Sequence, residues 1–181
     1  MLRLSQQSQM IALYRHIESL IDRPQGKLIL LLSGHPGEGV STIAAGLAEF
    51  CGDVLGRSVL VMEIKHGWAM QPAVDATGSR WQDFQAPETE TNREAFSSNI
   101  AQYRLGYEYV ILVSPALSVT TTGLEMAQHA DGVVLVIEAE SSRWKSSRRI
   151  CEEIVGSGGN LLGVVLNKRR RHIPSWLASF L

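Results

Sequence analysis

The sequence predicts an α/β fold, namely a doubly wound, mainly parallel sheet with helices on both faces. Nearly continuous apolar runs alternate along the chain with segments in which apolar residues recur every three or four positions. Strands covered on both faces have the first pattern, and the helices that cover them have the second. In addition, a glycine-rich turn links the first apolar run to an Ala-rich helical segment. This is the arrangement of a phosphate-binding loop.

Length and composition indicate a single globular domain. The chain has 181 residues, of which 45% are hydrophobic and 19% charged, enough for a well-buried core. We expect residues 1–167 to form this domain, including an N-terminal amphipathic helix, and residues 168–181 to form a basic amphipathic tail. A net charge of −1 gives no general attraction for polyanions, so no nucleic-acid partner is expected. Cys51 and Cys151 lack metal-ligand spacing and are expected to be buried thiols in a reducing cytoplasm.

The elements alternate regularly along the chain. Helical periodicity predicts helices over residues 5–22, 41–54, 93–105, 120–129 and 141–155. The apolar runs predict strands over residues 27–33, 58–64, 107–114, 132–138 and 161–167. Breakers separate them: Gly26 precedes the first strand, Gly56 ends the second helix, Pro115 ends the third strand, and residues 156–159 end the last helix. Residues 68–92 are rich in Pro, Gly, Thr, Gln and acids, which indicates an extended connection.

The turn after the first strand reads Gly34-His-Pro-Gly-Glu-Gly-Val-Ser-Thr42. Gly34 and Gly39 have the spacing of the phosphate-loop pattern G-x-x-x-x-G-K-[ST], and Ser41 and Thr42 offer the hydroxyl that binds Mg²⁺. Val40 stands at the lysine position. Because a charge-assisted hydrogen bond contributes about 1.5–3 kcal/mol, an isopropyl group there argues against turnover more than against folding.

Several motifs together resemble those of a known family. They are Pro36-Gly-Glu-Gly39, Tyr109-Val-Ile-Leu112 before Pro115, Ala130-Asp-Gly132 and Gly163-Val-Val-Leu-Asn167. Over residues 10–170 the chain resembles the bacterial tyrosine autokinases (BY-kinases) of capsule and exopolysaccharide synthesis. That family lies within the P-loop ATPases that include the MinD/ParA-like partitioning and septum-placement proteins. The resemblance implies a P-loop NTPase-like fold. It also implies a nucleotide site formed by Gly34, Gly37, Glu38, Gly39, Val40, Ser41, Thr42 and Asn167.

The chain departs from that family at the residues that perform catalysis. The family holds Mg²⁺ and ATP with the loop lysine, two acids after the second strand and an acid that ends the third strand. The corresponding residues here are Val40, Glu63, Lys65 and Val113. Only Glu63 keeps its charge, and neither a valine nor a lysine can serve as an oxygen ligand for Mg²⁺. We expect these segments to converge on one degenerate pocket, where Ser41 and Glu63 would hold Mg²⁺ if it binds.

Other family features are reduced as well. The tyrosine-rich C-terminal segment of the family has no counterpart, since the last tyrosine is Tyr109. Members of the family assemble into rings through the motif E-x-x-R-x-x-R. Here Arg15 is the single residue of that motif that is retained, which argues against a homo-oligomer formed in this way. Asn167 matches a position that often contacts the nucleotide base. A polar residue at the end of a buried strand can equally cap the following turn, so both roles remain open.

The tail combines a basic block with an apolar stripe. Lys168, Arg169, Arg170 and Arg171 precede Ile173, Trp176, Leu177, Phe180 and Leu181, which share one helical face. Such a segment suits an anionic membrane surface, with Trp176 at the interface. Equally, it suits a terminal helix that packs on its own domain or on a partner.

These observations favour a pseudokinase or pseudo-ATPase that acts in exopolysaccharide biosynthesis through protein contacts and without a cofactor. The expected partner is a membrane-embedded polysaccharide co-polymerase or exporter component, or an active tyrosine kinase. We expect a cytoplasmic location, peripheral to the inner face of the plasma membrane if the tail binds lipid. The alternative is a divergent tyrosine kinase or ATPase that binds ATP and Mg²⁺ through Lys65 and Glu63. A second alternative is a partitioning-type ATPase relative.

Overall fold

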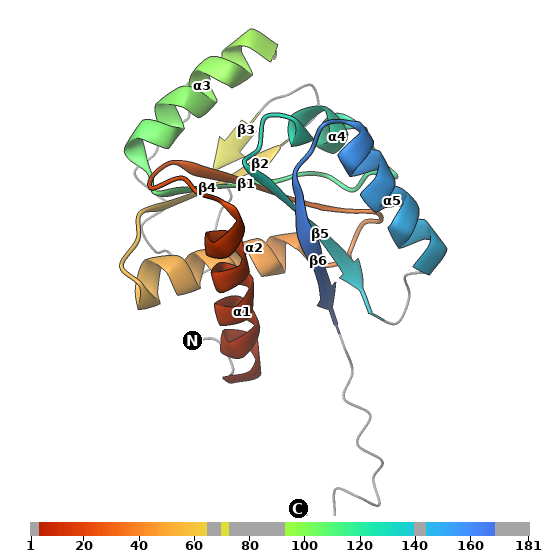
Figure 1. The fold of residues 1–181 in the computed structure, drawn as a ribbon, viewed down its shortest axis with the longest axis horizontal. Helices are drawn as coiled ribbons and strands as arrows, with labels where there is room; N and C mark the ends of the chain where they lie inside the picture. Colours follow the sequence, from red (N-terminus) through yellow and green to blue (C-terminus); the bar gives the residue numbers. More distant parts are fainter. Residues whose placement is uncertain (1–3, 65–69, 73–92, 140–143, 169–181) are drawn as a thin grey trace, which may run out of the picture.

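A six-stranded sheet forms the centre of the protein (Figure 1). The structure is a computed structural model that describes residues 4–64, 70–72, 93–139 and 144–168. The strand order is β3-β2-β4-β1-β5-β6, and every strand is parallel to its neighbours except β3, which runs antiparallel to β2. The strands are β1 (Lys27–Ser33), β2 (Val59–Ile64), β3 (Met70–Pro72), β4 (Tyr109–Val113), β5 (Gly132–Glu138) and β6 (Leu161–Asn167).

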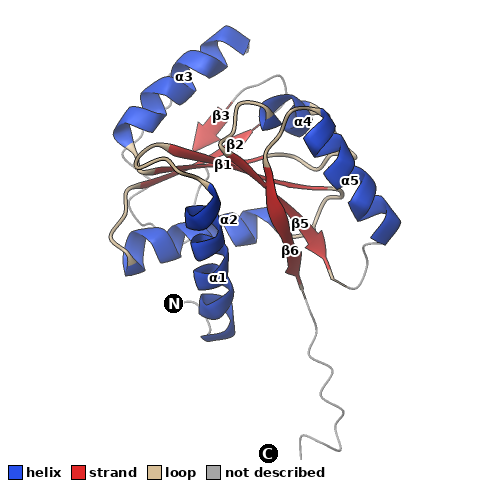
Figure 2. Ribbon diagram, in the orientation of Figure 1, coloured by secondary structure: helices blue, strands red, loops and turns tan. Residues whose placement is uncertain are grey.

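Helices cover both faces of this sheet (Figure 2). They are α1 (Leu4–Leu20), α2 (Val40–Glu49), which continues as the π-helix η1 (Phe50–Val54), α3 (Arg93–Gly106), α4 (Thr122–Ala127) and α5 (Trp144–Gly156). Buried residues of α1, α2 and η1 form one apolar cluster with one face of the sheet, and those of α3, α4 and α5 form another with the opposite face. The predicted doubly wound α/β fold is therefore confirmed.

Strand β1 shows why its apolar run is continuous. Ile29 and Leu31 belong to the cluster under α1 and α2, whereas Leu28, Leu30 and Leu32 belong to the cluster under α3, α4 and α5. All of these leucine and isoleucine side chains are 0% exposed. A strand in the middle of a doubly wound sheet has no solvent face, so it cannot alternate apolar and polar residues.

Three features differ from the predictions. First, β3 pairs with β2 inside the segment predicted to be an extended connection. Second, the helix predicted over 41–54 widens into a π-helix at its end, a change that apolar spacing does not reveal. Third, β6 is an edge strand and not a fully buried one, because the order of the described strands ends with it. Its residues Val164 and Leu166 are 44% and 52% exposed.

The cysteine prediction is confirmed for one thiol and wrong for the other. Cys51 is buried in η1, and burial raises its pKa to about 12. Cys151 on α5 is only half-buried. In the part of the chain that the structure describes, no helix has both the length and the apolar character needed to cross a bilayer.

A small ionic cluster joins α1 to the amino ends of β1 and β4. Lys27, whose side chain is 7% exposed, donates to the Glu18 carboxylate, and the Tyr109 hydroxyl donates to the same oxygen at 2.5 Å. Burial by itself raises the pKa of Glu18, but the hydrogen bonds from Lys27 and Tyr109 outweigh it and hold the pKa below its usual value. The ionised carboxylate therefore stabilises the fold.

We expect Glu18→Gln to destabilise the protein at neutral pH and to lose this effect in acid. A carboxyl whose pKa is lower in the folded state stabilises above its unfolded pKa, and the stabilisation disappears as pH falls through the folded pKa. Urea unfolding of wild type and variant between pH ~7 and ~3 measures the gap. If the difference in the free energy of unfolding between wild type and Glu18→Gln stays constant across this pH range, ionisation of Glu18 does not stabilise the protein.

Candidate functional site

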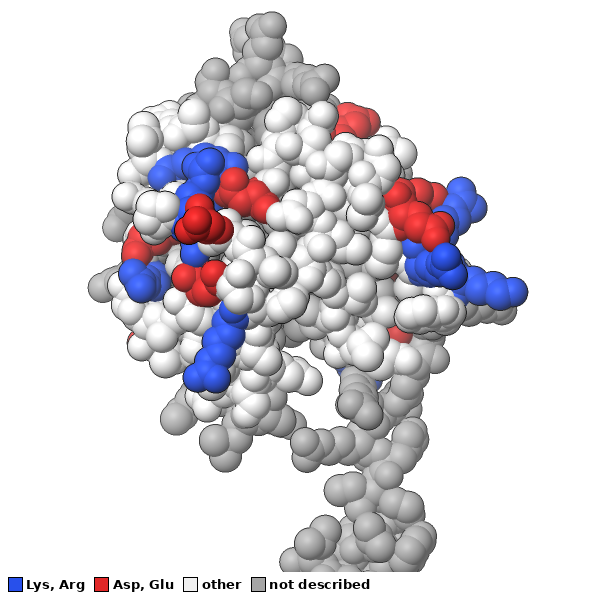
Figure 3. Space-filling view, viewed as in Figure 1, with Lys and Arg blue, Asp and Glu red and all other residues white. Residues whose placement is uncertain are grey.

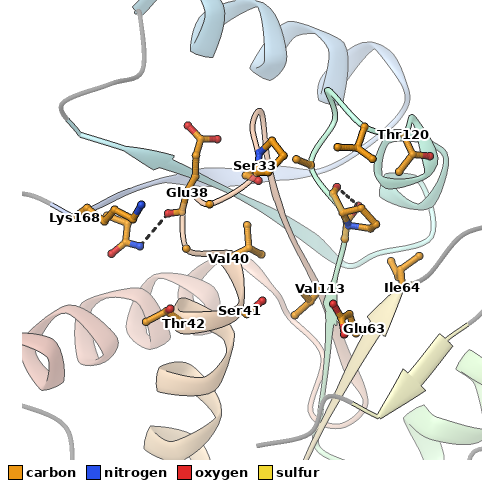
Figure 4. A pocket seen from close by; sticks show the side chains of 18 residues that line it. Ser33, Glu38, Val40, Ser41, Thr42, Glu63, Ile64, Val113, Thr120 and Lys168 are labelled. Atoms are coloured by element: carbon orange, nitrogen blue, oxygen red, sulfur yellow. Dashed lines mark hydrogen bonds between the residues drawn. The ribbon is translucent and has the colours of Figure 1, made fainter.

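The candidate site is a cavity of about 720 Å³ at the carboxyl ends of β1, β2 and β4 (Figure 4). From β1 the chain passes to β2 and then β4, which both lie to one side of β1 in the strand order. It then crosses to β5 and β6 on the other side of β1, so the strand order reverses at β1. Open α/β sheets bind ligands at such a point. The turn between β1 and α2, here called the P-loop (residues 34–42), forms one wall.

Glycines give the P-loop its shape. Gly37 and Gly39 have φ angles of 84° and 94°. Residues other than glycine rarely adopt this left-handed conformation. Gly34 has a different reason to be glycine, because a Cβ atom there would lie 2.5 Å from Cδ1 of Ile150 on α5. It allows close packing between the loop and the helix and does not line the cavity.

Side chains of the protein itself hold the P-loop in place. Glu38 is 3% exposed, and its carboxylate accepts hydrogen bonds from the backbone N–H of His35 at 2.9 Å and of Glu138 at 3.4 Å. The Asn167 amide donates to the backbone carbonyl of Glu38 at 2.9 Å. This contact is with the P-loop, so it is neither of the two roles left open for Asn167, which were contact with a nucleotide base and capping of the turn after β6. The Glu38 carboxylate therefore holds the loop through these two hydrogen bonds.

The three family positions on Val40, Glu63 and Val113 do come together. Val113 is the register partner of Glu63 across β2 and β4, and both line the cavity with Val40 (Figure 4). Val40 and Val113 are 8% and 5% exposed, so each belongs to the apolar core as well as to the cavity wall. At the two positions where the resemblance expects a lysine and a metal-binding acid, the structure thus has packed hydrocarbon side chains.

The donors present do not fit a magnesium–nucleotide complex held as the family holds it. Ser41, Thr42 and Glu63 line the cavity and offer hydroxyls and one carboxylate, and the loop adds backbone N–H groups. Val40 and Val113 themselves supply neither a cation nor a second acid beside Glu63, and the cationic side chain that lines the cavity among the described residues, Lys168, pairs with Glu138. Within the described ranges there is also no group of three His, Cys, Asp or Glu that could hold a metal ion.

The other predicted site residues are distributed as follows. Lys168 lines the cavity, with φ at 54° and an ion pair to Glu138 at 3.3 Å, although the sequence assigned it to the tail. Arg15 is exposed on α1. Lys65 and the tail residues Arg169, Arg170, Arg171 and Trp176 lie outside the described residues.

Three polar residues that line the cavity were not predicted as part of it. They are Ser33, Ser114 and Thr120. Ser33 ends β1 and donates to the carbonyl of His35 at 3.0 Å, and Ser114 follows β4 and donates to the carbonyl of Pro115 at 2.9 Å. Their place after apolar strands is a usable signal, because the carboxyl ends of parallel strands meet at one edge. Thr120 gave no comparable signal.

A glycine-rich loop that joins a buried parallel strand to a helix, at the reversal point of the strand order, defines a protein of the P-loop α/β class. Within that class the structure is similar to solved kinase domains. The VpsO kinase domain matches with a TM-score of 0.68 and 21% identity over 92% of this chain and 96% of that chain. The kinase domain of the Escherichia coli tyrosine kinase ETK matches with a TM-score of 0.68 and 12% identity over 89% and 76%.

The chimerical protein CapA2B2 matches with a TM-score of 0.67 and 21% identity over 90% of this chain and 84% of that chain. The predicted resemblance to the BY-kinases is thereby confirmed. No protein-family model matches the chain, and no curated protein sequence does. At these identities the likeness establishes the fold, so the function has to be argued from the site.

Proposed function

We propose that this protein is a catalytically degenerate relative of the BY-kinase domains that acts as an accessory or regulatory subunit in exopolysaccharide biosynthesis or export. Its function lies in contacts with other proteins. The partner is a membrane-embedded co-polymerase or exporter component, or an active tyrosine kinase. The observation that carries this proposal is the pair of valines, Val40 and Val113, in the cavity beside Glu63.

Energetics support the proposal. Phosphoryl transfer depends on positive charge that neutralises the developing charge on the phosphates, supplied by the loop lysine and by metal ions held on oxygen ligands. The valines offer neither a charge nor a lone pair. Since each charge-assisted hydrogen bond contributes about 1.5–3 kcal/mol, loss of the lysine and of one ligand acid weakens both nucleotide binding and transition-state stabilisation.

The way the loop is held also fits a protein that keeps the turn for structural reasons. Glu38 and Asn167 connect the P-loop to the ends of β5 and β6 through hydrogen bonds that need no ligand. A loop stabilised in this way keeps β1 joined to α2. The surface around it can then serve a partner protein.

A rival function rests on Glu63, Ser41 and Thr42, which do face the cavity. In that case the protein is a divergent ATPase or tyrosine kinase, with Lys65 as the cation. Lys65 follows the cavity-lining residue Ile64 in the sequence and lies outside the described residues.

A titration with MgATP separates the two functions. We expect no rise in the thermal unfolding midpoint of wild type up to millimolar MgATP, because a ligand stabilises only the state that binds it. We also expect no phosphotyrosine after incubation. A clear rise together with ATP turnover that Lys65→Ala abolishes would overturn the pseudo-enzyme and establish the rival.

A restored variant provides the positive control. Val40→Lys together with Val113→Asp puts back the loop cation and the acid next to Glu63. We expect this double variant to gain a midpoint that rises with MgATP, whereas Val40→Leu together with Val113→Leu does not. If the restored variant binds no nucleotide while remaining folded, the loss of binding in wild type cannot be assigned to the two valines.

A further inference from the structure

The two edges of the described sheet differ in how they are protected against pairing with another sheet. At one edge, β3 is three residues long and ends with Pro72, which has no N–H to donate. Short edge strands and proline both prevent edge-to-edge pairing. At the other edge, β6 is seven residues long, and its sequence Leu-Leu-Gly-Val-Val-Leu-Asn contains neither a charged residue nor a proline. β6 therefore lacks the protections that β3 has.

The backbone of β6 directs hydrogen-bonding groups to this edge. The Asn167 carbonyl accepts from the Ala139 N–H at 3.0 Å, so Asn167 faces β5. Along a strand, the N–H and C=O groups of successive residues alternate between the two sides, which places those of Val165 toward β5 as well. Val164 and Leu166 then direct theirs outward, where no described strand pairs with them.

The side chains at these two outward positions are apolar. On β5 the register partners of Val164 and Leu166 are Leu135 and Ile137, which pack in the cluster under α3, α4 and α5. Val164 and Leu166 therefore lie on the same face of the sheet as α5, and they remain 44% and 52% exposed. An edge strand that presents apolar side chains together with backbone donors and acceptors is a template for pairing with another chain.

We propose that β6 is a homodimer interface, in which the β6 strands of two copies of this chain pair antiparallel about a two-fold axis through Val165. Val164 of each copy then lies opposite Leu166 of the other, and each of these two pairs exchanges two backbone hydrogen bonds. The contact is self-complementary, as a two-fold interface requires. An axis perpendicular to the sheet keeps its faces, so α5 of one copy lies beside α5 of the other. The dimer does not depend on whether the cavity binds nucleotide.

Residues at the ends of β6 determine where the axis lies. The His16 imidazole lies 2.8 Å from the Leu162 carbonyl and occupies this acceptor. At the other end, Lys168 has a φ of 54°, which is not a strand conformation. The stretch between these two residues, 163–167, is centred on Val165. An axis through Val165 therefore uses the part of β6 that is extended and whose outward groups face no described strand.

Helix α5 adds a second surface at the same edge. Ile150 points toward Gly34 of the P-loop, on the side of β1. Trp144 and Val155, which are 80% and 60% exposed, are about three helical turns apart and so share one flank of α5. Around the helix, the fully buried Ile154 lies between this flank and Ile150. The flank therefore faces away from β1, toward β6 and the edge.

The charges of α5 are ordered for contact with an antiparallel copy. The basic residues Lys145, Arg148 and Arg149 lie in its first half and the acidic residues Glu152 and Glu153 in its second. Figure 3 shows charged side chains gathered over α5, at the right of the molecule. This order opposes the helix dipole, which favours acids at the start of a helix and bases at its end. Beside an antiparallel copy it is complementary, because the first half of each helix meets the second half of the other.

The strand pair and the helix pair share one axis. α5 has 13 residues and spans about 20 Å, and β6 has seven and spans about 23 Å. The two elements run in opposite directions and are joined by the short turn 157–160, so their midpoints lie side by side. Residue 150 is the midpoint of α5 and also lies midway between Arg148 and Glu152. The axis that pairs the β6 strands therefore places Arg148 of one copy opposite Glu152 of the other.

Sedimentation equilibrium of the full chain tests the dimer. We expect wild type to dimerise and Leu166→Lys to raise the dissociation constant roughly tenfold or more, because a lysine on an edge strand opposes pairing. Leu105→Lys, at an 81% exposed position of α3, is the matched control and should dimerise as wild type does. A wild-type chain that is monomeric at roughly 0.1 mM, or a Leu166→Lys variant that dimerises equally well, would overturn the proposal.

Charge reversal tests the contact between the α5 helices. Within one chain Arg148 and Glu152 pair at 2.9 Å, and each single reversal, Arg148→Glu or Glu152→Arg, breaks this pair and puts like charges across the axis. We expect each variant alone to dimerise about tenfold more weakly than wild type. A mixture of the two should form heterodimers, since opposite charges then face each other only between copies. Arg149→Glu mixed with Glu153→Arg, on the flank away from β6, is the control. Equal behaviour of the two mixtures would overturn the paired arrangement.

A disulfide across the axis tests the register. In a Cys151→Ser background, where the remaining thiol is the buried Cys51, Val165→Cys should form a disulfide between copies under mild oxidation. A pair of residues directly opposite in antiparallel strands, with no hydrogen bond between them, brings its Cβ atoms close. Leu166→Cys should not form one, because Val164 stands opposite it, although position 166 is more exposed than 165. Preferential crosslinking of Leu166→Cys would overturn the register.

Discussion

Gly39→Ala is expected to lower the free energy of unfolding by about 3 kcal/mol. The new Cβ would lie 2.0 Å from the amide nitrogen of Asn167, and φ at this position is 94°. A left-handed conformation costs a residue other than glycine roughly 1–2 kcal/mol, and overpacking adds about 1–3 kcal/mol. Displacement of Asn167 would also break its hydrogen bond to the P-loop carbonyl of Glu38. Urea denaturation measures the loss.

Gly37→Ala separates the two contributions. Its φ of 84° is similar, but nothing lies within 4 Å of the Cβ position, so only the conformational cost of about 1–2 kcal/mol is expected. Combining Gly39→Ala with Asn167→Ala should recover part of the difference by removing the clash. Equal losses in the free energy of unfolding for Gly37→Ala and Gly39→Ala would contradict the close approach of Asn167 to Gly39 seen in the structure.

Asp131→Ala is expected to lower the free energy of unfolding by about 3 kcal/mol, because it leaves the backbone N–H of Leu28 without its acceptor and removes the negative charge that faces the half-buried Arg104. The Asp131 carboxylate accepts from the Leu28 N–H at 2.7 Å and from Arg104 at 2.5 Å, and Arg23 lies 3.5 Å away. The side chains of Asp131 and Arg104 are only 16% and 17% exposed. These contacts join β1, β5 and α3 at the amino edge of the sheet.

Asp22→Ala is the control for this change. Asp22 is exposed just after α1, and an exposed substitution is expected to alter the free energy of unfolding by no more than about 0.5 kcal/mol. Thermal and urea unfolding should rank the variants in the same order. A cost for Asp131→Ala as small as that for Asp22→Ala would mean that solvent replaces the carboxylate without loss.

The Asp131 network also explains one motif behind the family resemblance. Ala130-Asp-Gly132 lies at the amino edge of β5, away from the cavity at the carboxyl edge. Asp131 ties neighbouring elements together, and a Cβ at Gly132 would lie 2.3 Å from Leu162. This motif therefore reports the fold and carries no information about catalysis. The residues informative about catalysis are Val40, Glu63 and Val113.

For the site, sequence reasoning succeeded where position along the chain fixes position in space. The P-loop follows β1 directly, and Glu63 and Val113 lie near the ends of parallel strands, so their meeting in one cavity could be predicted. The roles of Glu38 and Asn167 could not. Each depends on contacts over 100 residues or more in sequence, Glu38 with Glu138 and Asn167 with the loop, which no local pattern encodes.

The sequence by itself determined the alternation of helices and strands, the doubly wound sheet and the presence of valines at positions 40 and 113, where the resemblance expects a lysine and an acid. These are local properties. The apolar pattern of a segment indicates whether it is buried on one face or on two, and the chemistry of a side chain depends on the residue type alone. Only the tertiary structure decided that β6 lies at an edge of the described sheet and that Lys168 lines the cavity. Strand order depends on how segments distant in sequence pair, and the free energy of that pairing is shared by the whole sheet.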